Sequence, residues 1–345
     1  MRSPLLDVPG AVPAQAPDAG VAAHYGDPYA EQRALTQSAG VVDRSHRDVI
    51  RITGQDRLSW LHSLTTQHLE QLAPGGSAQA LILSPNGHVE HALTLTDDGT
   101  ATWAHVEPGA GESLAKFLES MRFRLAVEPA DVSGDYAVLT LMGPQSDAQI
   151  VDSPAAVIAS GLGTDLVIAR GQLAATAALL QSRGVALAGM WAHEAVRIAG
   201  REPRFGLDTD HRTIPHEVGW IETAVHLSKG CYRGQETVAR VHNLGHPPRR
   251  LVLLHLDGSE DRLPGHGDPV TLAGADVGFV GSAARHYELG PIALALVKRT
   301  VPVQATLAAA GLPAAQEVIV APDAGANVKA ALRRQRSDLT ARARE

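Results

Sequence analysis

Hydrophobic and polar positions along the first half of the chain predict strands and helices in alternation. A β-branched run over residues 48–53 is followed by leucines at helical spacing from residue 58 onward, which indicates a strand, a turn and a helix. Strand-like runs over residues 78–84 and 88–96 flank Asn86-Gly87, a pair typical of β-hairpins. The pattern predicts an antiparallel α+β arrangement in this half.

The pattern changes towards the C-terminus. Helices are predicted around residues 173–182 and 191–199. Beyond Pro247-Pro248, short apolar runs alternate with turns rich in glycine and proline. This rhythm is typical of a small all-β barrel or sandwich, so we expect an α+β fold with a C-terminal all-β barrel.

The chain has 345 residues, 44% of them hydrophobic, which suits two or three packed units. We see no signal peptide and no run long enough to cross a membrane, so we expect a cytoplasmic protein. The expected organisation is a flexible arm at 1–24, a first α+β part at 25–145, a second at 146–246, the barrel at 247–325 and a basic tail at 326–345.

Charge and cysteine content exclude several classes of protein. The chain carries 30 Lys and Arg against 37 Asp and Glu, a net charge of −7, so neither nucleic acid nor an anionic membrane is an expected partner. Its basic tail is short and lacks aromatic residues, which favours a solvated tail over a nucleic-acid arm. A single cysteine excludes a disulfide or a multi-cysteine metal site within the chain. The histidine spacing fits no metal motif, so no metal site is expected.

That cysteine, Cys231, lies in the sequence Lys-Gly-Cys-Tyr-Arg-Gly-Gln-Glu at residues 229–236. Glycines flank it, Lys229 and Arg233 are near it, and a helix is predicted from Gln235 to Val241. Cationic neighbours and a helix N-terminus both favour thiolate over thiol. The pattern therefore indicates a reactive cysteine, and the alternative is an inert buried one.

Residues 229–236 resemble the signature of the YgfZ family, folate-binding proteins linked to iron–sulfur cluster maintenance. Residues 40–54 resemble the opening of the wider superfamily that includes the aminomethyltransferase of the glycine cleavage system, and the likeness extends over about residues 25–320. The resemblance implies a ring of two interleaved α+β domains and a C-terminal β-barrel around a channel that accepts tetrahydrofolate.

Two positions differ from the aminomethyltransferases. Their catalytic aspartate aligns with His91, and an imidazole cannot stabilise a developing cation as a carboxylate does. The carboxylate that commonly follows the arginine at position 197 is replaced by Ala199, which weakens the case for folate binding. We expect His91, Arg197 and Ala199 to line the channel, and Trp191 and Arg197 to contact the folate.

The favoured hypothesis is an accessory protein that supports assembly or repair of iron–sulfur clusters in client enzymes through Cys231. Two alternatives stay open: a folate-dependent one-carbon transferase or demethylase, and a docking scaffold that binds no folate. The expected roles in the loop are activation of the thiol by Lys229 and Arg233, shaping of the turn by Tyr232 and Gln235, and capping of the helix by Glu236.

Overall fold

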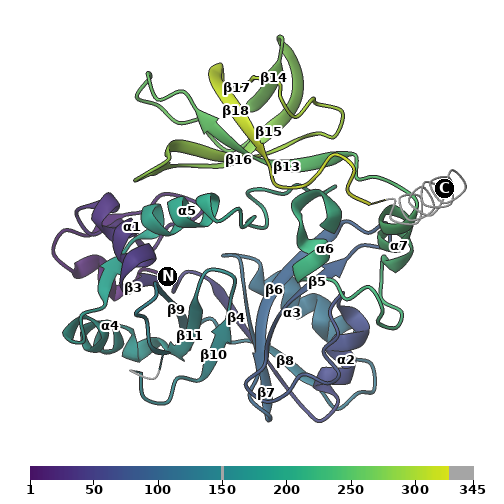
Figure 1. The fold of residues 1–345 in the computed structure, drawn as a ribbon. Helices are drawn as coiled ribbons and strands as arrows, with labels where there is room; N and C mark the ends of the chain where they lie inside the picture. The colour runs from purple at the N-terminus through teal and green to yellow at the C-terminus, as the bar shows by residue number, and fades with distance from the viewer. Residues whose placement is uncertain (149–150, 326–345) are drawn as a thin grey trace, which may run out of the picture.

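The computed structural model describes residues 1–148 and 151–325, so the predicted basic tail lies outside the described residues. Three lobes surround a common centre: two five-stranded sheets and a closed six-stranded barrel (Figure 1). The predicted fold class, α+β with a C-terminal all-β barrel, is confirmed. Within these described ranges, no helix is long and apolar enough to span a bilayer.

The first sheet has the strand order β10-β11-β9-β3-β12, in which only the β12–β3 pair is parallel. Leucines and valines on one face pack against helix α4, and helix α1 contacts β12. The elements are α1 (Pro28–Gln37), β3 (Gly40–Asp43), β9 (Tyr136–Met142), β10 (Ala156–Ala159), β11 (Thr164–Ala169), α4 (Leu173–Ser182) and β12 (Ala186–Ala188).

The second sheet, β5-β6-β7-β4-β8, is antiparallel throughout. Alternate residues such as Ile50, Ile52, Leu93 and Leu95 form one core with the helices α2 and α3. The elements are β4 (Asp48–Thr53), α2 (Arg57–Leu64), β5 (Ser77–Leu83), β6 (Val89–Asp97), β7 (Ala101–Val106), α3 (Gly111–Ser120) and β8 (Glu128–Asp131). The hairpin predicted at Asn86-Gly87 is confirmed as β5–β6.

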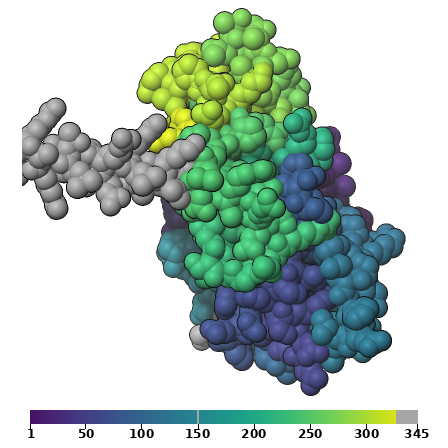
Figure 2. Space-filling model, turned by 90° about the vertical axis from the view of Figure 1, so that its right-hand side faces the viewer, coloured from purple at the N-terminus to yellow at the C-terminus, as the bar shows by residue number. Residues whose placement is uncertain are grey.

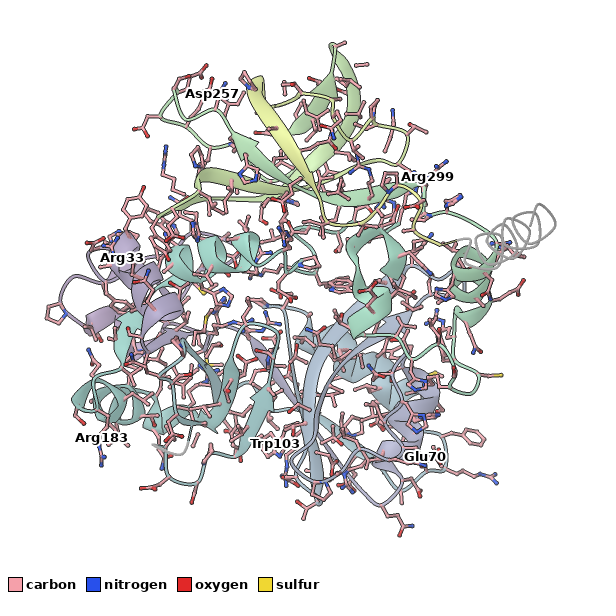
Figure 3. All side chains as sticks on the ribbon, viewed as in Figure 1. Arg33, Glu70, Trp103, Arg183, Asp257 and Arg299 are labelled. Carbon is pink, nitrogen blue, oxygen red and sulfur yellow. The ribbon has the colours of Figure 1, made fainter. Side chains whose placement is uncertain are left out.

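The two sheets are nested rather than consecutive. All strands of the second sheet lie between β3 and β9, which pair with each other in the first sheet. The division expected between residues 145 and 146 therefore does not separate the lobes, because local pattern cannot report pairing between distant strands. Trp103 of β7 belongs to the apolar cluster that joins the sheets, and Figure 3 places it between them.

The barrel has the order β13-β16-β15-β14-β17-β18. Along β13, Val252, Leu254 and Leu256 fill the barrel, whereas Leu251 and Leu253 point outward into a second core. The strands are β13 (Arg249–Leu256), β14 (Pro269–Leu272), β15 (Ala275–His286), β16 (Gly290–Lys298), β17 (Leu307–Ala309) and β18 (Leu312–Val318). This second core attaches the barrel to the rest of the molecule.

Residues 189–246 connect the lobes. They form α5 (Met190–Ala199), the 3₁₀ helix η4 (Pro215–Val218), the short α6 (Trp220–Thr223) and α7 (Gln235–Asn243). Figure 2 shows the green part of this segment covering one face of the molecule, between the yellow barrel and the blue second sheet. The segment thus touches every lobe.

The N-terminal residues form a folded element, which corrects the expectation of a flexible arm at 1–24. They contain the 3₁₀ helix η1 (Pro4–Asp7) and the paired strands β1 (Val12–Pro13) and β2 (Ala22–His24). Leu5 is buried against the first sheet. Asp18 forms an ion pair with Arg204 at 2.6 Å, so the segment is tied to a residue far along the chain. Its proline-rich composition conceals these long-range contacts.

Candidate functional site

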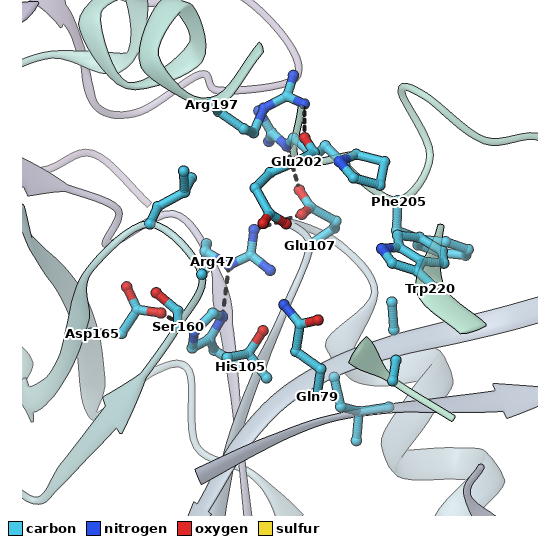
Figure 4. Close-up of a pocket in the computed structure, with 18 of the residues that line it drawn as sticks. Arg47, Gln79, His105, Glu107, Ser160, Asp165, Arg197, Glu202, Phe205 and Trp220 are labelled. Atoms are coloured by element: carbon cyan, nitrogen blue, oxygen red, sulfur yellow. Dashed lines mark hydrogen bonds and ion pairs between the residues drawn. The ribbon is translucent and has the colours of Figure 1, made fainter. Parts of the chain in front are cut away.

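A cavity of about 110 Å³ lies where the two sheets meet the connecting segment (Figure 4). Strands β5 and β6 contribute Gln79, Leu81, Ala92 and Thr94. The opposite wall comes from α5 and the loop after it, including Arg197, Glu202 and Phe205, and from Trp220 of α6. Aromatic, apolar and charged groups therefore converge in one small space, as in many ligand sites.

Most of the charged groups in this cavity wall neutralise one another. Glu107 accepts hydrogen bonds from Arg47 at 2.6 Å and from Arg204 at 2.7 Å. His105 bonds to Arg47 at 2.9 Å and to Asp165 at 2.8 Å. Although burial opposes ionisation, the neighbouring arginines hold the pKa of Glu107 well below its usual range. These residues form a fixed network that joins both sheets to the N-terminal segment.

Arg197 belongs to the same network, which corrects its expected role in folate binding. Its Nε and Nη2 donate to Glu194, at 3.1 and 2.6 Å, and Nη1 donates to Asp208 at 2.8 Å. Its remaining bonds go to the carbonyl of Glu202 at 2.6 Å and to Ser282 of the barrel at 2.8 Å. With its five N–H donors used in this way, the buried guanidinium has none left for a ligand. Arg197 fastens α5 to the barrel.

The other two predicted folate contacts lie elsewhere. The His91 ring lies 6.1 Å from that of Phe117 on the α3 side of the second sheet, while the next residue, Ala92, lines the cavity. Alternation along a strand explains the difference of one position. Trp191 is 56% exposed and lines a separate cavity between α1 and the barrel, beside His24. Ala199 packs against the apolar core below the barrel.

Three residues that line the cavity were not predicted from the sequence: Gln79, Glu202 and Trp220. Trp220 carries no functional signal in the sequence, because a tryptophan in an apolar segment is equally well explained by core packing. Glu202 lies within residues 25–320, over which the family resemblance extends, and this position was the available signal. Gln79 lies in an ordinary strand pattern without any signal.

A larger cavity of about 820 Å³ adjoins the first and shares Glu202, Pro203 and Trp220 with it. Its wall also includes His216, His242 and the residues 226–228, which lead directly to Lys229. Cys231 itself lines neither cavity. A ligand that occupied both cavities would thus reach the base of the cysteine loop.

The cysteine loop is fastened by Lys229. Its buried ammonium donates to the carbonyls of His62, of Thr65 at 2.5 Å and of Gln67 at 3.0 Å. The first two are at the C-terminal end of α2, where carbonyls lack helical partners and the helix dipole favours a cation. Burial lowers the pKa of Lys229 to about 8. Because the ammonium is engaged here, Lys229 positions the loop. Its expected activation of the thiol stays a prediction.

The remaining loop residues reinforce this arrangement. The buried Tyr232 ring lies beside the Lys229 ammonium, with 5.2 Å between the ring centre and Nζ. The Gln235 side-chain amide donates to the Lys229 carbonyl at 3.4 Å. Arg233 pairs with Glu90 of β6 at 2.9 Å and is therefore engaged away from the thiol. The exposed Glu236 is in the first turn of α7 without a side-chain capping bond, because Gly234 is the N-cap.

Gly234 brings the loop against the β5–β6 hairpin. Its φ is +82°, and a Cβ there would lie 2.6 Å from the carbonyl oxygen of Ser84. Only glycine meets both requirements. Cys231 remains exposed on the outer side, and the structure over its described ranges gives the thiol no hydrogen-bond partner. The result is an accessible sulfur on a firmly held loop.

Replacing Lys229 by methionine is expected to loosen this loop. Three carbonyls lose their donor, and the buried one, that of Thr65, costs about 1–3 kcal/mol if left unpaired. Amide hydrogen exchange of residues 226–236 should accelerate at least about tenfold, which corresponds to about 1.4 kcal/mol. Arg233→Met removes only a half-exposed pair and is the control. Unchanged exchange in Lys229→Met would rule out the clamp.

Buried histidines should make the fold sensitive to acid. Burial lowers the pKa of His105, His193 and His216 to about 4, from about 6.5 in an unfolded chain. Between these values the unfolded state binds more protons, so stability falls as pH decreases through this window. Neither ring nitrogen of His216 has a partner in the described structure. His216→Phe should therefore reduce the loss of unfolding free energy between pH 7 and 5 by about 2 kcal/mol. The measurement is a smaller fall in Tm over this pH range than in wild type. An equally steep loss would contradict this.

Comparison with known proteins defines the class. Residues 22–155 match the GCVT N-terminal domain, and residues 249–334 match the glycine cleavage T-protein C-terminal barrel domain. The chain belongs to the superfamily of the glycine cleavage T-protein. The aminomethyltransferase T of the glycine cleavage system from Bartonella henselae shares the fold, with a TM-score of 0.77 at 19% identity over 91% of this chain and 94% of that one.

Curated relatives agree with this class. The chain is 26% identical to an aminomethyltransferase of Synechococcus sp. (strain WH7803) over 74% of this chain and 78% of the relative. It is 25% identical to a putative chloroplastic transferase of Arabidopsis thaliana over 73% of this chain, spanning 65% of that relative's length. These matches give the superfamily but do not separate its branches.

Proposed function

We propose that this chain is a YgfZ-like, folate-binding accessory protein that supports assembly or repair of iron–sulfur clusters in client enzymes of the cytoplasm. The observation that carries the proposal is the exposed thiol of Cys231 on a loop clamped by Lys229, Tyr232 and Gly234. A reactive group held in this way is available to another macromolecule without rearrangement of the fold.

The cysteine count supports a role between proteins. Iron–sulfur clusters are normally held by four ligands, chiefly thiolates, whereas this chain offers one cysteine. In the described ranges, no three His, Cys, Asp or Glu side chains are grouped as metal ligands would be. Any cluster contact by Cys231 must therefore be shared with a client, a second chain or a small thiol, and the cluster is cargo rather than a resident cofactor.

The paired cavities support tetrahydrofolate as the small-molecule ligand. The central cavity of about 110 Å³ is too small for a whole folate, but it shares Glu202, Pro203 and Trp220 with the neighbouring cavity of about 820 Å³. Trp220 and Phe205 offer aromatic faces in the central cavity. A flat bicyclic head there, with the remainder of the molecule in the larger cavity, suits both volumes.

A folate-dependent one-carbon transferase is the second candidate, and the names of the curated relatives favour it. The cavity argues against it, because Ala92 and Thr94 of β6 face the ligand space where a carboxylate would be needed, and Glu90 is paired with Arg233. A third reading, a docking scaffold without folate, requires that no folate binds.

Three measurements separate these functions. In cells, removal of the chain should lower the specific activity of iron–sulfur enzymes while enzymes without clusters keep theirs. With purified protein, titration calorimetry with tetrahydrofolate tests the ligand. Loss of the methylene group of added 5,10-methylenetetrahydrofolate to an amine, with tetrahydrofolate as the other product, tests transfer. Client defects with folate binding and no transfer support the proposal, transfer supports the second candidate, and client defects without folate binding support the scaffold.

A further inference from the structure

We propose that Glu202, assisted by Gln79, is the polar group that selects the ligand of the central cavity, and that it takes a planar heterocycle with adjacent N–H donors on one edge. The inference rests on the proposed folate function and names the residues that would hold the folate head. It replaces the contacts expected of Arg197, Trp191 and His91, none of which is available to a ligand in this cavity.

Several charged groups in the cavity wall are already paired within the protein. Arg47 and Arg204 both bond to Glu107 of the same wall, and His105 bonds to Asp165. Arg197 is engaged by Asp208. A ligand would have to break these bonds in order to use those groups, at a cost of several kcal/mol for a buried ion pair. Recognition therefore falls to side chains whose polar atoms are unengaged.

Glu202 is such a side chain. Among residues 1–148 and 151–325 no hydrogen bond reaches its carboxylate. Its backbone is held by Arg197, whose guanidinium donates to the Glu202 carbonyl and whose own carbonyl accepts from the Glu202 N–H. The carboxylate lies against Gly161, where a Cβ would come within 2.8 Å of Oε1, and the residue lines both cavities. Partial burial raises the pKa of Glu202, as expected for a carboxylate that lacks a donor.

Gln79 faces the same space from the second sheet. It pairs with Thr94 across β5 and β6, and both side chains line the cavity without a hydrogen-bond partner in the described part of the chain. Figure 4 shows the Gln79 amide directed into the space below Glu107 and beside Trp220. An amide both donates and accepts, so it complements a ring edge that carries both kinds of group.

These groups define the chemistry of the ligand. Two carboxylate oxygens accept two parallel N–H bonds, as in bidentate pairs with guanidinium. Trp220 and Phe205 suit a flat ring. An aminopyrimidinone ring carries an exocyclic amino group next to a ring N–H and meets both demands, and reduced folates contain that ring.

The test is a thermodynamic cycle with two variants and two ligands. Tetrahydrofolate and its analogue lacking the 2-amino group are titrated anaerobically into wild type, Glu202→Gln and the control Glu128→Gln, an exposed carboxylate on β8. Glu202→Gln should weaken tetrahydrofolate binding by about tenfold or more, and Glu128→Gln by less than about twofold. The wild type should bind the analogue about tenfold more weakly than tetrahydrofolate, whereas Glu202→Gln should bind both alike.

A structural role of Glu202 would weaken both ligands equally and leave the analogue penalty intact, which would overturn the inference. So would a variant that binds tetrahydrofolate as well as wild type. Should the wild type bind no folate, the folate part of the proposed function would fall together with the inference, while the cellular assay of client enzymes would still test the role of Cys231. Far-UV circular dichroism of each variant verifies that it is folded.

Discussion

Cys231→Ser is expected to leave the fold intact and to lower the activity of client iron–sulfur enzymes to the level of cells that lack the chain. The thiol is exposed and makes no hydrogen bond within the described ranges, so the free energy of unfolding should change by less than about 0.5 kcal/mol. Serine preserves the volume but removes the soft, ionisable ligand that iron prefers. The measurement is client activity at equal levels of variant and wild-type protein.

Ala239→Ser is the matched control, since it places a hydroxyl on an exposed position of α7 outside residues 226–236. It should keep full client activity. Wild-type activity with Cys231→Ser would remove the thiol from the mechanism, and equal loss with both variants would indicate a general effect of the surface rather than thiol chemistry.

Arg197→Met is expected to destabilise the protein by about 3–5 kcal/mol, because it leaves Asp208 buried without its cation and leaves Glu194 with only the longer ion pair to Arg204 at 3.4 Å. Both carboxylates are almost fully enclosed, and the bond to Ser282 that fastens α5 to the barrel is also lost. The measurement is denaturant unfolding with the midpoint and slope compared with wild type.

Arg201→Met makes the same chemical change four positions further on. Arg201 is exposed and pairs with Glu317 on the surface, so its loss should cost less than about 1 kcal/mol. Similar, small losses for both variants would show that the Arg197 network contributes little to stability and would reopen a ligand-binding role for this arginine.

The sequence allowed the fold class and the cysteine loop to be predicted because both depend on local signals. Apolar runs, Asn86-Gly87 and the glycines around Cys231 act over a few residues. The partners of the loop could not be predicted. Lys229 contacts the carbonyls at the C-terminal end of α2. These residues are more than a hundred and fifty positions away in the sequence, so local signals do not reveal the contact.

The candidate site was predicted only in part for the same reason. Arg197 and Ala199 are on the correct helix, but a charged residue in a cavity wall can serve a ligand or the fold, and only its partners distinguish the two. His91 was one position from the residue that faces the cavity, an error that a bulge in the β5–β6 pairing between Ile82 and Leu83 makes easy. Predicting Glu202 would have required knowing which neighbouring charged side chains were already paired with one another.

The nesting of one sheet within the other sets an order for folding during synthesis. All strands of the second sheet leave the ribosome before β9, so that sheet can form while β3 still lacks both of its neighbours. The apolar edge of β3, Val41 and Val42, must wait for β9 and then for β12, which completes the sheet as a parallel strand. In the interval between these events the edges of β3 are unpaired, and an unpaired strand edge can pair with another chain.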